Sequence, residues 1–247
     1  NQSAFSKSCR LLRFESATET NRVQIVVRPA HDRFFSFTMT RNDPFDIELT
    51  PELILRAYRA GIFPMSESAD DPDIFWVSPQ MRGVLPLDGF RASKSLRKSM
   101  RKSGFSVVVD RDFSGVIEGC ATAGSDRDST WINPTIRSLY GELFAMGYCH
   151  TVEVYDGEAL VGGLYGLAIG GAFFGESMFH RRTDASKIAL AHLVDRLNAG
   201  GYALLDTQFI TDHLASLGGI EIPRAIYEIR LSGALNVEGD FYAWDRR

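Results

Sequence analysis

The chain has 247 residues, 45% of them hydrophobic and 23% charged, and its formal net charge at pH 7 is -4. This profile is typical of a globular protein with one large domain or two modest ones, and it excludes a uniformly basic coat. No apolar run approaches the roughly 20 residues that cross a bilayer, so the sequence predicts a soluble protein. Three cysteines without metal-type spacing, Cys9, Cys120 and Cys149, favour a reduced cytoplasmic protein.

Residues 1–38 form an irregular stretch in which arginines are spaced among Ser and Thr. They contain acids such as Glu15 and show no clear amphipathic helix, which argues against a transit peptide. We interpret 1–38 as a disordered or non-native extension, 39–90 as a small N-terminal domain and 91–247 as a larger domain. The alternative for the extension is that residues 23–27 (VQIVV) form an edge strand.

The first regular element is a helix that begins after Thr50. Thr50 suits an N-cap, Pro51 suits the first helical position, and apolar residues recur at helical spacing until Gly61 ends the helix. A loop over residues 61–73 follows, and then two short extended pieces, IFWVSP and RGVLPLD.

A basic helix comes next, in the segment FRASKSLRKSMRKSG, which Gly104 ends. At helical spacing its apolar residues, Leu96 and Met100, lie toward one side and its cations toward the other. Charge runs are commonly only solvated faces, but this one contains no acid in an otherwise acidic chain. That contrast favours binding of RNA or another polyanion. The cations of the opposite side are Lys94, Arg97, Lys98, Arg101 and Lys102.

The second half predicts a mixed α/β domain. FSVVVD reads as a strand, and FSGVIEGCA and TIRSLYGELFAMG read as helices. Two strands, HTVEVYDG and ALVGGLYGLAIGG, meet at the hairpin signal Asp156-Gly157, and AFFGESMF extends their sheet. The helix DASKIALAHLVDRLNAGG, the strand LLDTQF and the short helix ITDHLASLGG follow. This β-β-β-α-β-α order is consistent, by analogy, with an acyltransferase-type domain whose sheet splays near its centre.

The strand LLDTQF carries a carboxylate and an amide, Asp206 and Gln208, two positions apart. Strand alternation predicts that both lie on one face, and burying them costs free energy unless partners satisfy them. Glu176 adds a third polar group at the end of an apolar strand. Because one crossover helix separates the two strand ends, we expect a functional cleft where they meet.

Other catalytic arrangements are disfavoured by the sequence. The histidines lack a zinc-binding pattern such as HExxH, and we expect the mid-helix His192 to be exposed. No serine lies in a G-x-S-x-G elbow, and no histidine lies near Cys120 or Cys149 in the sequence apart from His150 beside Cys149. The glycine pairs belong to hairpins rather than to a phosphate loop.

Five segments together resemble the bacterial leucyl/phenylalanyl-tRNA–protein transferases. The likeness runs over about residues 49–242, and its last two segments are highly specific. The segments are AYRAGIFPM, WVSPQMRGVLPLD, TWI, GESMFHRRTDASKIAL and LLDTQFITDHLASLGGIEIPR.

The resemblance implies an aminoacyltransferase of the cytoplasmic N-degron pathway. It would move Leu or Phe from aminoacyl-tRNA to the α-amine of proteins that begin with Arg or Lys. The implied fold is a small N-terminal domain followed by an acetyltransferase-like (GNAT-type) mixed-sheet domain. No cofactor or metal is implied, and CoA is not expected, since the place of its phosphate-binding glycine loop reads HRRTDASK.

The resemblance assigns the catalytic tasks to Asp206 and Gln208. An aminoacyl ester is already activated, and an α-amine with a pKa of roughly 7.7–8.0 is partly neutral, so no nucleophilic residue is needed. Gln208 would accept a hydrogen bond from the amine, and Asp206 would polarise or orient Gln208. An amide is too weak a base to hold a proton, which favours a relay over simple general-base catalysis. Glu176, with Asp206, would attract the acceptor's N-terminal Arg or Lys.

The remaining tasks implied by the resemblance are recognition of the amino acid and of the tRNA. The candidate lining of an apolar pocket for Leu or Phe comprises Phe173, Ser177, Met178 and Trp131. Trp76 and Met65, the latter at a position where many relatives carry Trp, would lie near the adenosine. The basic helix would hold the acceptor stem without reading its sequence. A CoA-dependent N-acetyltransferase and a non-enzymatic RNA-binding module are the alternatives.

Overall fold

The structure is a computed structural model that describes residues 9–14, 22–23, 26–27, 47–66, 68–71, 74–122 and 130–246. By its internal contacts the chain forms two units, Asn1–Gln80 with Ser129–Ile136, and Met81–Asp128 with Arg137–Arg247. This division by contacts does not test whether the parts fold separately. The domain boundary predicted near residue 90 therefore stays a prediction.

The described residues of the first unit include the helix α1 and two small sheets. The helix α1 begins as predicted, because the Thr50 side chain accepts a hydrogen bond from the Leu53 backbone nitrogen at 3.3 Å. One sheet has the order β3-β1-β6-β5, and β2 pairs with β4. The bounds are β1 Cys9–Phe14, β2 Arg22–Val23, β3 Val26–Val27, β4 Ile47–Glu48, α1 Pro51–Arg59, β5 Phe63–Met65 and β6 Ile74–Pro79.

Most of residues 1–38 lie outside the described part of the chain, so the prediction of a disordered extension stays a prediction. Within that segment the backbone of β1 pairs antiparallel with β6, and β3, inside the alternative edge strand at residues 23–27, pairs with β1.

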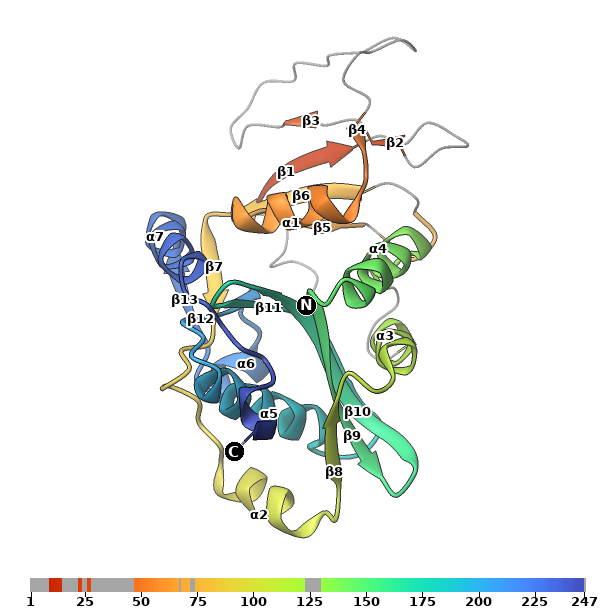
Figure 1. Ribbon diagram of the computed structural model, residues 1–247, viewed down its shortest axis with the longest axis vertical. Helices are drawn as coiled ribbons and strands as arrows, with labels where there is room; N and C mark the ends of the chain where they lie inside the picture. The colour runs from red at the N-terminus through yellow and green to blue at the C-terminus, as the bar shows by residue number, and fades with distance from the viewer. Residues whose placement is uncertain are drawn as a thin grey trace. The chain divides into compact units, whose positions relative to one another are not determined.

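The second unit is built on a seven-stranded mixed sheet with the order β13-β7-β12-β11-β10-β9-β8 (Figure 1). The hairpin between β9 and β10 turns at Gly157, whose φ is 61°, as the sequence predicted. The strand bounds are β7 Met81–Val84, β8 Ser106–Val109, β9 Cys149–Asp156, β10 Ala159–Ile169, β11 Ala172–His180, β12 Leu204–Gln208 and β13 Ile220–Pro223.

Helices cover both faces of this sheet (Figure 1). A β-carbon added to Gly162 would meet Ala185 of α5, whereas one added to its neighbour Gly163 would meet Val116 of α3. Since successive strand residues point to opposite faces, α5 and α3 lie on opposite sides of the sheet. The bounds are α2 Lys94–Lys102, α3 Phe113–Thr122, α4 Pro134–Ala145, α5 Ala185–Ala199, α6 Asp212–Ser216, α7 Arg224–Leu235 and the 3₁₀ helix η2 Ala243–Arg246.

The α/β fold class and the predicted order of strands and helices are confirmed. β11 and β12 pair in parallel at Ala172–Leu204, Phe173–Leu205 and Phe174–Asp206. Although β11 continues to His180, no further pair with β12 is present in the described residues. The backbone pairing of these two central strands therefore ends at Asp206, near the centre of the sheet, where the order of the elements predicted a splay by analogy.

Leu96 is the buried residue of α2, whereas Met100 is 41% exposed. The expectation that His192 is exposed was wrong. His192 is half-buried and packs edge-on against Trp244, with ring centroids 5.9 Å apart. Burial and the nearby Arg196 charge lower the pKa of His192.

None of the helices in the described residues combines the length and the apolar composition that a membrane crossing requires.

Candidate active site

Gln208 lies at the end of β12 in a strained backbone conformation. Its φ is 56°, a left-handed value that is uncommon for residues other than glycine. The Phe209 backbone nitrogen donates to the Thr207 carbonyl oxygen at 2.6 Å, so Gln208 is the central residue of a three-residue turn. A positive φ at that position marks the rarer, strained form of the γ-turn. Strain of this kind is concentrated at functional sites.

This turn breaks the strand alternation that the sequence predicted. The pairing of β12 with β7 shifts register between Asp206 and Gln208, so the two residues do not follow one another on a regular strand. Their hydrogen bond joins the Gln208 backbone nitrogen to Asp206 Oδ1 at 2.8 Å. Asp206 therefore holds the main chain of Gln208, and the prediction of two neighbouring side chains on a regular strand is wrong.

Asp206 is fully buried, with 0% of its surface exposed, and it is paired with Arg82 of β7. Arg82 Nε lies 2.9 Å from Oδ1, and Arg82 Nη2 lies 2.7 Å from Oδ2. The Tyr227 hydroxyl of α7 donates to Oδ2 at 2.6 Å. Burial, followed by the Asp206 charge, raises the pKa of Tyr227 far above its usual value, so Tyr227 remains a donor.

Glu176 holds the side chain of Gln208. In the β10–β11 pairing Tyr165 is opposite Ser177 and Gly166 is opposite Gly175, which leaves Glu176 as the extra residue of a β-bulge. Bulges re-aim side chains and are frequent next to active sites. Gln208 Nε2 donates to Glu176 Oε1 at 3.2 Å, and the Tyr140 hydroxyl of α4 donates to Oε2 at 3.1 Å.

The arrangement leaves the carbonyl of the Gln208 amide as the acceptor. Among the described residues no hydrogen bond reaches Gln208 Oε1, whereas its amide nitrogen is engaged by Glu176. Donation from the amide nitrogen to a carboxylate increases the acceptor strength of the same amide's oxygen. The site can therefore accept a hydrogen bond from an incoming N–H group.

Nucleophilic groups near this site are held neutral. Burial, and after it the Glu176 charge, raises the pKa of the Cys149 thiol and of the Tyr165 hydroxyl well above their usual values. Within the described residues, no three histidine, cysteine or carboxylate side chains are arranged to hold a metal ion.

Sequence comparisons identify the family. The family model "Leucyl/phenylalanyl-tRNA protein transferase" matches residues 84–232, and the model of that family's N-terminal domain matches residues 47–80. The leucyl/phenylalanyl-tRNA–protein transferase of Ruegeria sp. is 62% identical over 193 residues, which cover 78% of this chain and 90% of that protein. The one of Rhodopseudomonas palustris (strain HaA2) is 58% identical over 197 residues, covering 80% and 88%.

The chain belongs to this transferase family. The resemblance and the prediction of an aminoacyltransferase are thereby confirmed at the level of the family.

Among solved structures, a GCN5-related N-acetyltransferase-like protein from Streptococcus suis is similar with a TM-score of 0.33 and 16% identity, covering 69% of this chain and 63% of that one.

The pocket candidates of the transferase do not share one face of the sheet. Phe173 is fully buried in the core beneath α5, and Met178 packs against the same core. Ser177 is the β10 partner of Tyr165 and points to the opposite face from Met178. Met65, Trp76 and Trp131 belong to the first unit, where Trp76 is buried and the other two are half-buried.

The basic helix α2 forms as predicted, and all five of its candidate cations are exposed. The Ser93 side chain accepts from the Leu96 backbone nitrogen at 3.0 Å, which caps the first turn. The Ser99 hydroxyl donates to Asp184 Oδ2 at 2.7 Å and so fixes α2 to the start of α5. This hydrogen bond, to a carboxylate distant in the sequence, was not predicted.

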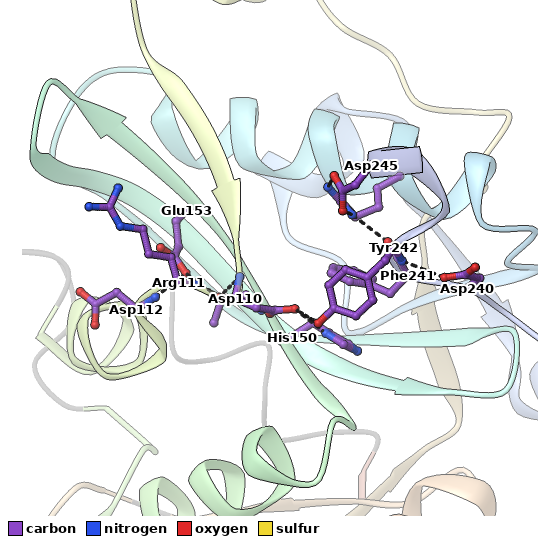
Figure 2. Close-up of polar contacts among 11 residues, drawn as sticks. Asp110, Arg111, Asp112, His150, Glu153, Asp240, Phe241, Tyr242 and Asp245 are labelled. Atoms are coloured by element: carbon purple, nitrogen blue, oxygen red, sulfur yellow. Dashed lines mark hydrogen bonds and ion pairs between the residues drawn. The ribbon is translucent and has the colours of Figure 1, made fainter. Parts of the chain in front are cut away.

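A second polar cluster, which no local pattern in the sequence predicts, holds the C-terminal segment to the sheet (Figure 2). Asp110 Oδ2 lies 2.8 Å from His150 Nδ1 and accepts from the Tyr242 hydroxyl at 2.6 Å. The His150 ring stacks on Phe241 with centroids 4.0 Å apart. Burial acts to raise the pKa of Asp110, but its hydrogen bonds outweigh burial and the pKa is lowered.

Proposed function

We propose that this chain transfers Leu or Phe from aminoacyl-tRNA to the free α-amine of proteins that begin with Arg or Lys. Such a transfer would mark the acceptor for degradation in the cytoplasm. The observation that carries the proposal is the Gln208 amide, held by Glu176 at 3.2 Å with its oxygen available. Membership of the transferase family supports the donor and acceptor classes.

The reaction needs positioning more than covalent catalysis. The neutral amine nitrogen attacks the ester carbonyl carbon, a C–N bond forms, and the C–O bond to the tRNA ribose breaks. The proton lost by the nitrogen ends on the leaving ribose oxygen. Gln208 Oε1 accepts a hydrogen bond from the amine and aims its lone pair, and orientation of this kind supplies several kcal/mol.

Glu176 supplies the negative charge at the site. Its oxygens accept from Gln208 and Tyr140, and it is half-buried rather than fully enclosed. Asp206 is fully buried and ion-paired with Arg82, so it cannot reach an acceptor side chain. We therefore assign attraction of the acceptor's cationic end to Glu176 and not to Asp206.

Recognition of the amino acid and of the tRNA completes the proposal. Within the second unit, the half-buried Met178 and Ser177 are the candidates for the lining that receives Leu or Phe, whereas Phe173 is fully enclosed in the core. Trp131 as a further lining candidate, and Trp76 and Met65 as candidates near the adenosine, belong to the first unit and stay predictions. Selection by methyl placement in an apolar pocket is worth about 1–3 kcal/mol, so it is incomplete. The exposed cations of α2 bind the acceptor-stem phosphates.

The start of α5 argues against a CoA donor. In place of a phosphate-binding glycine loop it carries the Asp184 carboxylate, which accepts from Ser99 and from Lys187 Nζ at 3.0 Å. These hydrogen bonds lower the pKa of Asp184, so the carboxylate stays charged and opposes a pyrophosphate there.

The test is to mix the chain with labelled Leu-tRNA and a Lys-initiated peptide and to follow label on the peptide. We expect transfer that an N-acetylated peptide abolishes and that Gln208→Ala strongly reduces without changing tRNA affinity. Asn236→Ala, which removes an exposed amide on the end of α7, serves as the control. Absence of transfer by the unaltered chain, or acetyl transfer from CoA, would overturn the proposal.

A further inference from the structure

The Asp206 carboxylate has no capacity left for a substrate. Oδ1 accepts from Arg82 Nε at 2.9 Å and from the Gln208 backbone nitrogen at 2.8 Å. Oδ2 accepts from Arg82 Nη2 at 2.7 Å and from the Tyr227 hydroxyl at 2.6 Å. A carboxylate offers about four lone-pair sites, and all four are used. Asp206 thus acts within the protein rather than on the reacting groups.

Arg82 and Tyr227 both bind this carboxylate and contact each other. Arg82 is 1% exposed and Tyr227 is 2% exposed. The Arg82 guanidinium lies over the Tyr227 ring, with its carbon 4.5 Å from the ring centroid. A buried charge pair of this kind costs desolvation energy and is weak support for stability by itself. Its most direct consequence is therefore the fixed orientation of Asp206.

The same strand also shapes the chain that leaves Gln208. A β-carbon on Gly83 would lie 2.5 Å from the Phe209 carbonyl carbon and 2.9 Å from the Ile210 nitrogen. Glycine is thus required at position 83 for the backbone of the turn to pass this close. β7 therefore contacts the turn through two successive residues, Arg82 by way of Asp206 and Gly83 by way of Phe209.

We propose that Arg82 and Tyr227 are positioning residues which, through Asp206, hold Gln208 in its strained turn and aim its amide at the incoming amine. The inference rests on the proposed transfer reaction for its catalytic consequence. A strained turn persists only where its surroundings over-determine it. Here the Asp206 carboxylate, held by Arg82 and Tyr227, accepts a hydrogen bond from the Gln208 backbone N–H. Weakening the hydrogen bond between Asp206 and the Gln208 backbone lets the turn relax, which moves Gln208 Oε1 away from its position.

Tyr227→Phe tests the proposal, because it removes one hydroxyl and keeps the ring beneath Arg82. The matched control is Tyr155→Phe, since the Tyr155 hydroxyl donates to another buried carboxylate, Glu153, at 3.0 Å. We expect Tyr227→Phe to lower kcat by roughly tenfold with the KM for aminoacyl-tRNA unchanged. Tyr155→Phe should leave kcat unchanged even where it lowers stability equally. Equal effects of the two variants on kcat would overturn the proposal.

A double-mutant cycle separates positioning from general destabilisation. If Tyr227 acts through Gln208, adding Tyr227→Phe to Gln208→Ala should cost no further single-turnover rate. An undiminished additional loss in the double variant contradicts the mechanism.

Amide hydrogen exchange at Gln208 provides a readout that needs no activity. Its N–H is held by Asp206, so Tyr227→Phe should speed its exchange at least severalfold while Tyr155→Phe leaves it unchanged. Unchanged exchange in Tyr227→Phe refutes the anchoring even if transfer occurs. Conversely, a chain that shows the exchange effect but no transfer disproves the proposed function and leaves the anchoring standing.

Discussion

Asp206 and Arg82 are each nearly inaccessible to solvent, and each depends on the other for its charge to be tolerated in the interior. Removing one member of a buried pair leaves an uncompensated charge, which is far more costly than replacing both members together. Substitutions at Asp206 therefore act on folding as well as on Gln208.

We expect Asp206→Asn to lower the free energy of unfolding by about 3–5 kcal/mol, since the Arg82 guanidinium loses its counter-charge. Urea denaturation at pH 7 measures this change. Asp195→Asn, at an exposed carboxylate on α5, is the control and should differ from the unaltered chain by less than about 0.5 kcal/mol. If Asp206→Asn matched that control, the assigned cost of the buried pair would be incorrect.

At the scale of elements, a bulge within β11 and a turn at the end of β12 build the candidate site. The bulge of β11 re-aims Glu176, and the turn that ends β12 re-aims Gln208, so that their side chains meet at 3.2 Å. Regular strands would continue to pair beyond Asp206. The two irregularities thus interrupt the pairing of β11 with β12 at the candidate site.

The helix α2 is short and firmly held, and its charged side chains are exposed. Leu96 is its one buried residue, and its ends are fixed by the Ser93 cap and by the Ser99–Asp184 hydrogen bond. Phosphate contacts made from such a helix release counterions and carry no sequence information.

Lys98→Ala should therefore weaken binding of all tRNAs alike. We expect the slope of log K against log salt concentration to fall in magnitude by about 1, because one phosphate contact is lost. Fluorescence titrations at several salt concentrations measure the slope. Arg230→Ala, at an exposed cation of α7, should leave it unchanged. Weakening confined to one tRNA would show that Lys98 reads sequence instead.

At the scale of the whole molecule, local signals in the sequence predicted most elements. Caps and glycines located α1 and α2, and Asp156-Gly157 located the hairpin of β9 and β10. Asp206, Gln208 and Glu176 were selected as candidates because polar groups in apolar strands need partners. The strand β13 and the helix α7 received no assignment, although they follow directly in the chain.

The partners of those polar groups could not be predicted. Arg82 binds a carboxylate 124 residues away in the chain, and no local pattern encodes that distance. The same holds for Tyr227, whose helix was not assigned. Alternation failed at Gln208 because it presumes a regular backbone, and the left-handed φ there depends on tertiary contacts. The structure is thus needed to identify the distant residues, Arg82 and Tyr227, that pair with the buried Asp206 carboxylate.

The C-terminal segment is also held to the second unit by polar contacts between residues that lie far apart in the chain. Tyr242 and His150 both contact Asp110 (Figure 2). Arg196 donates to Asp245 at 2.6 Å and to the Phe241 carbonyl oxygen at 2.8 Å. Because the pKa of Asp110 is lower in the folded chain than its ordinary value of about 3.9, the ionised carboxylate stabilises the fold. That contribution is complete above the unfolded-state pKa and is lost as pH falls through the folded-state pKa.

Asp110→Asn should accordingly be less stable than the unaltered chain at pH 7, and the difference should shrink as pH falls below about 4. Urea denaturation of both chains at steps from pH 7 to pH 3 measures the difference directly. Tyr242→Phe removes one of the donors that stabilise the ionised form, so its smaller stability loss should fade over the same pH range. A stability difference that stays constant down to pH 3 would mean that the Asp110 charge contributes nothing, and that the cluster holds the C-terminal segment by packing of Phe241 alone.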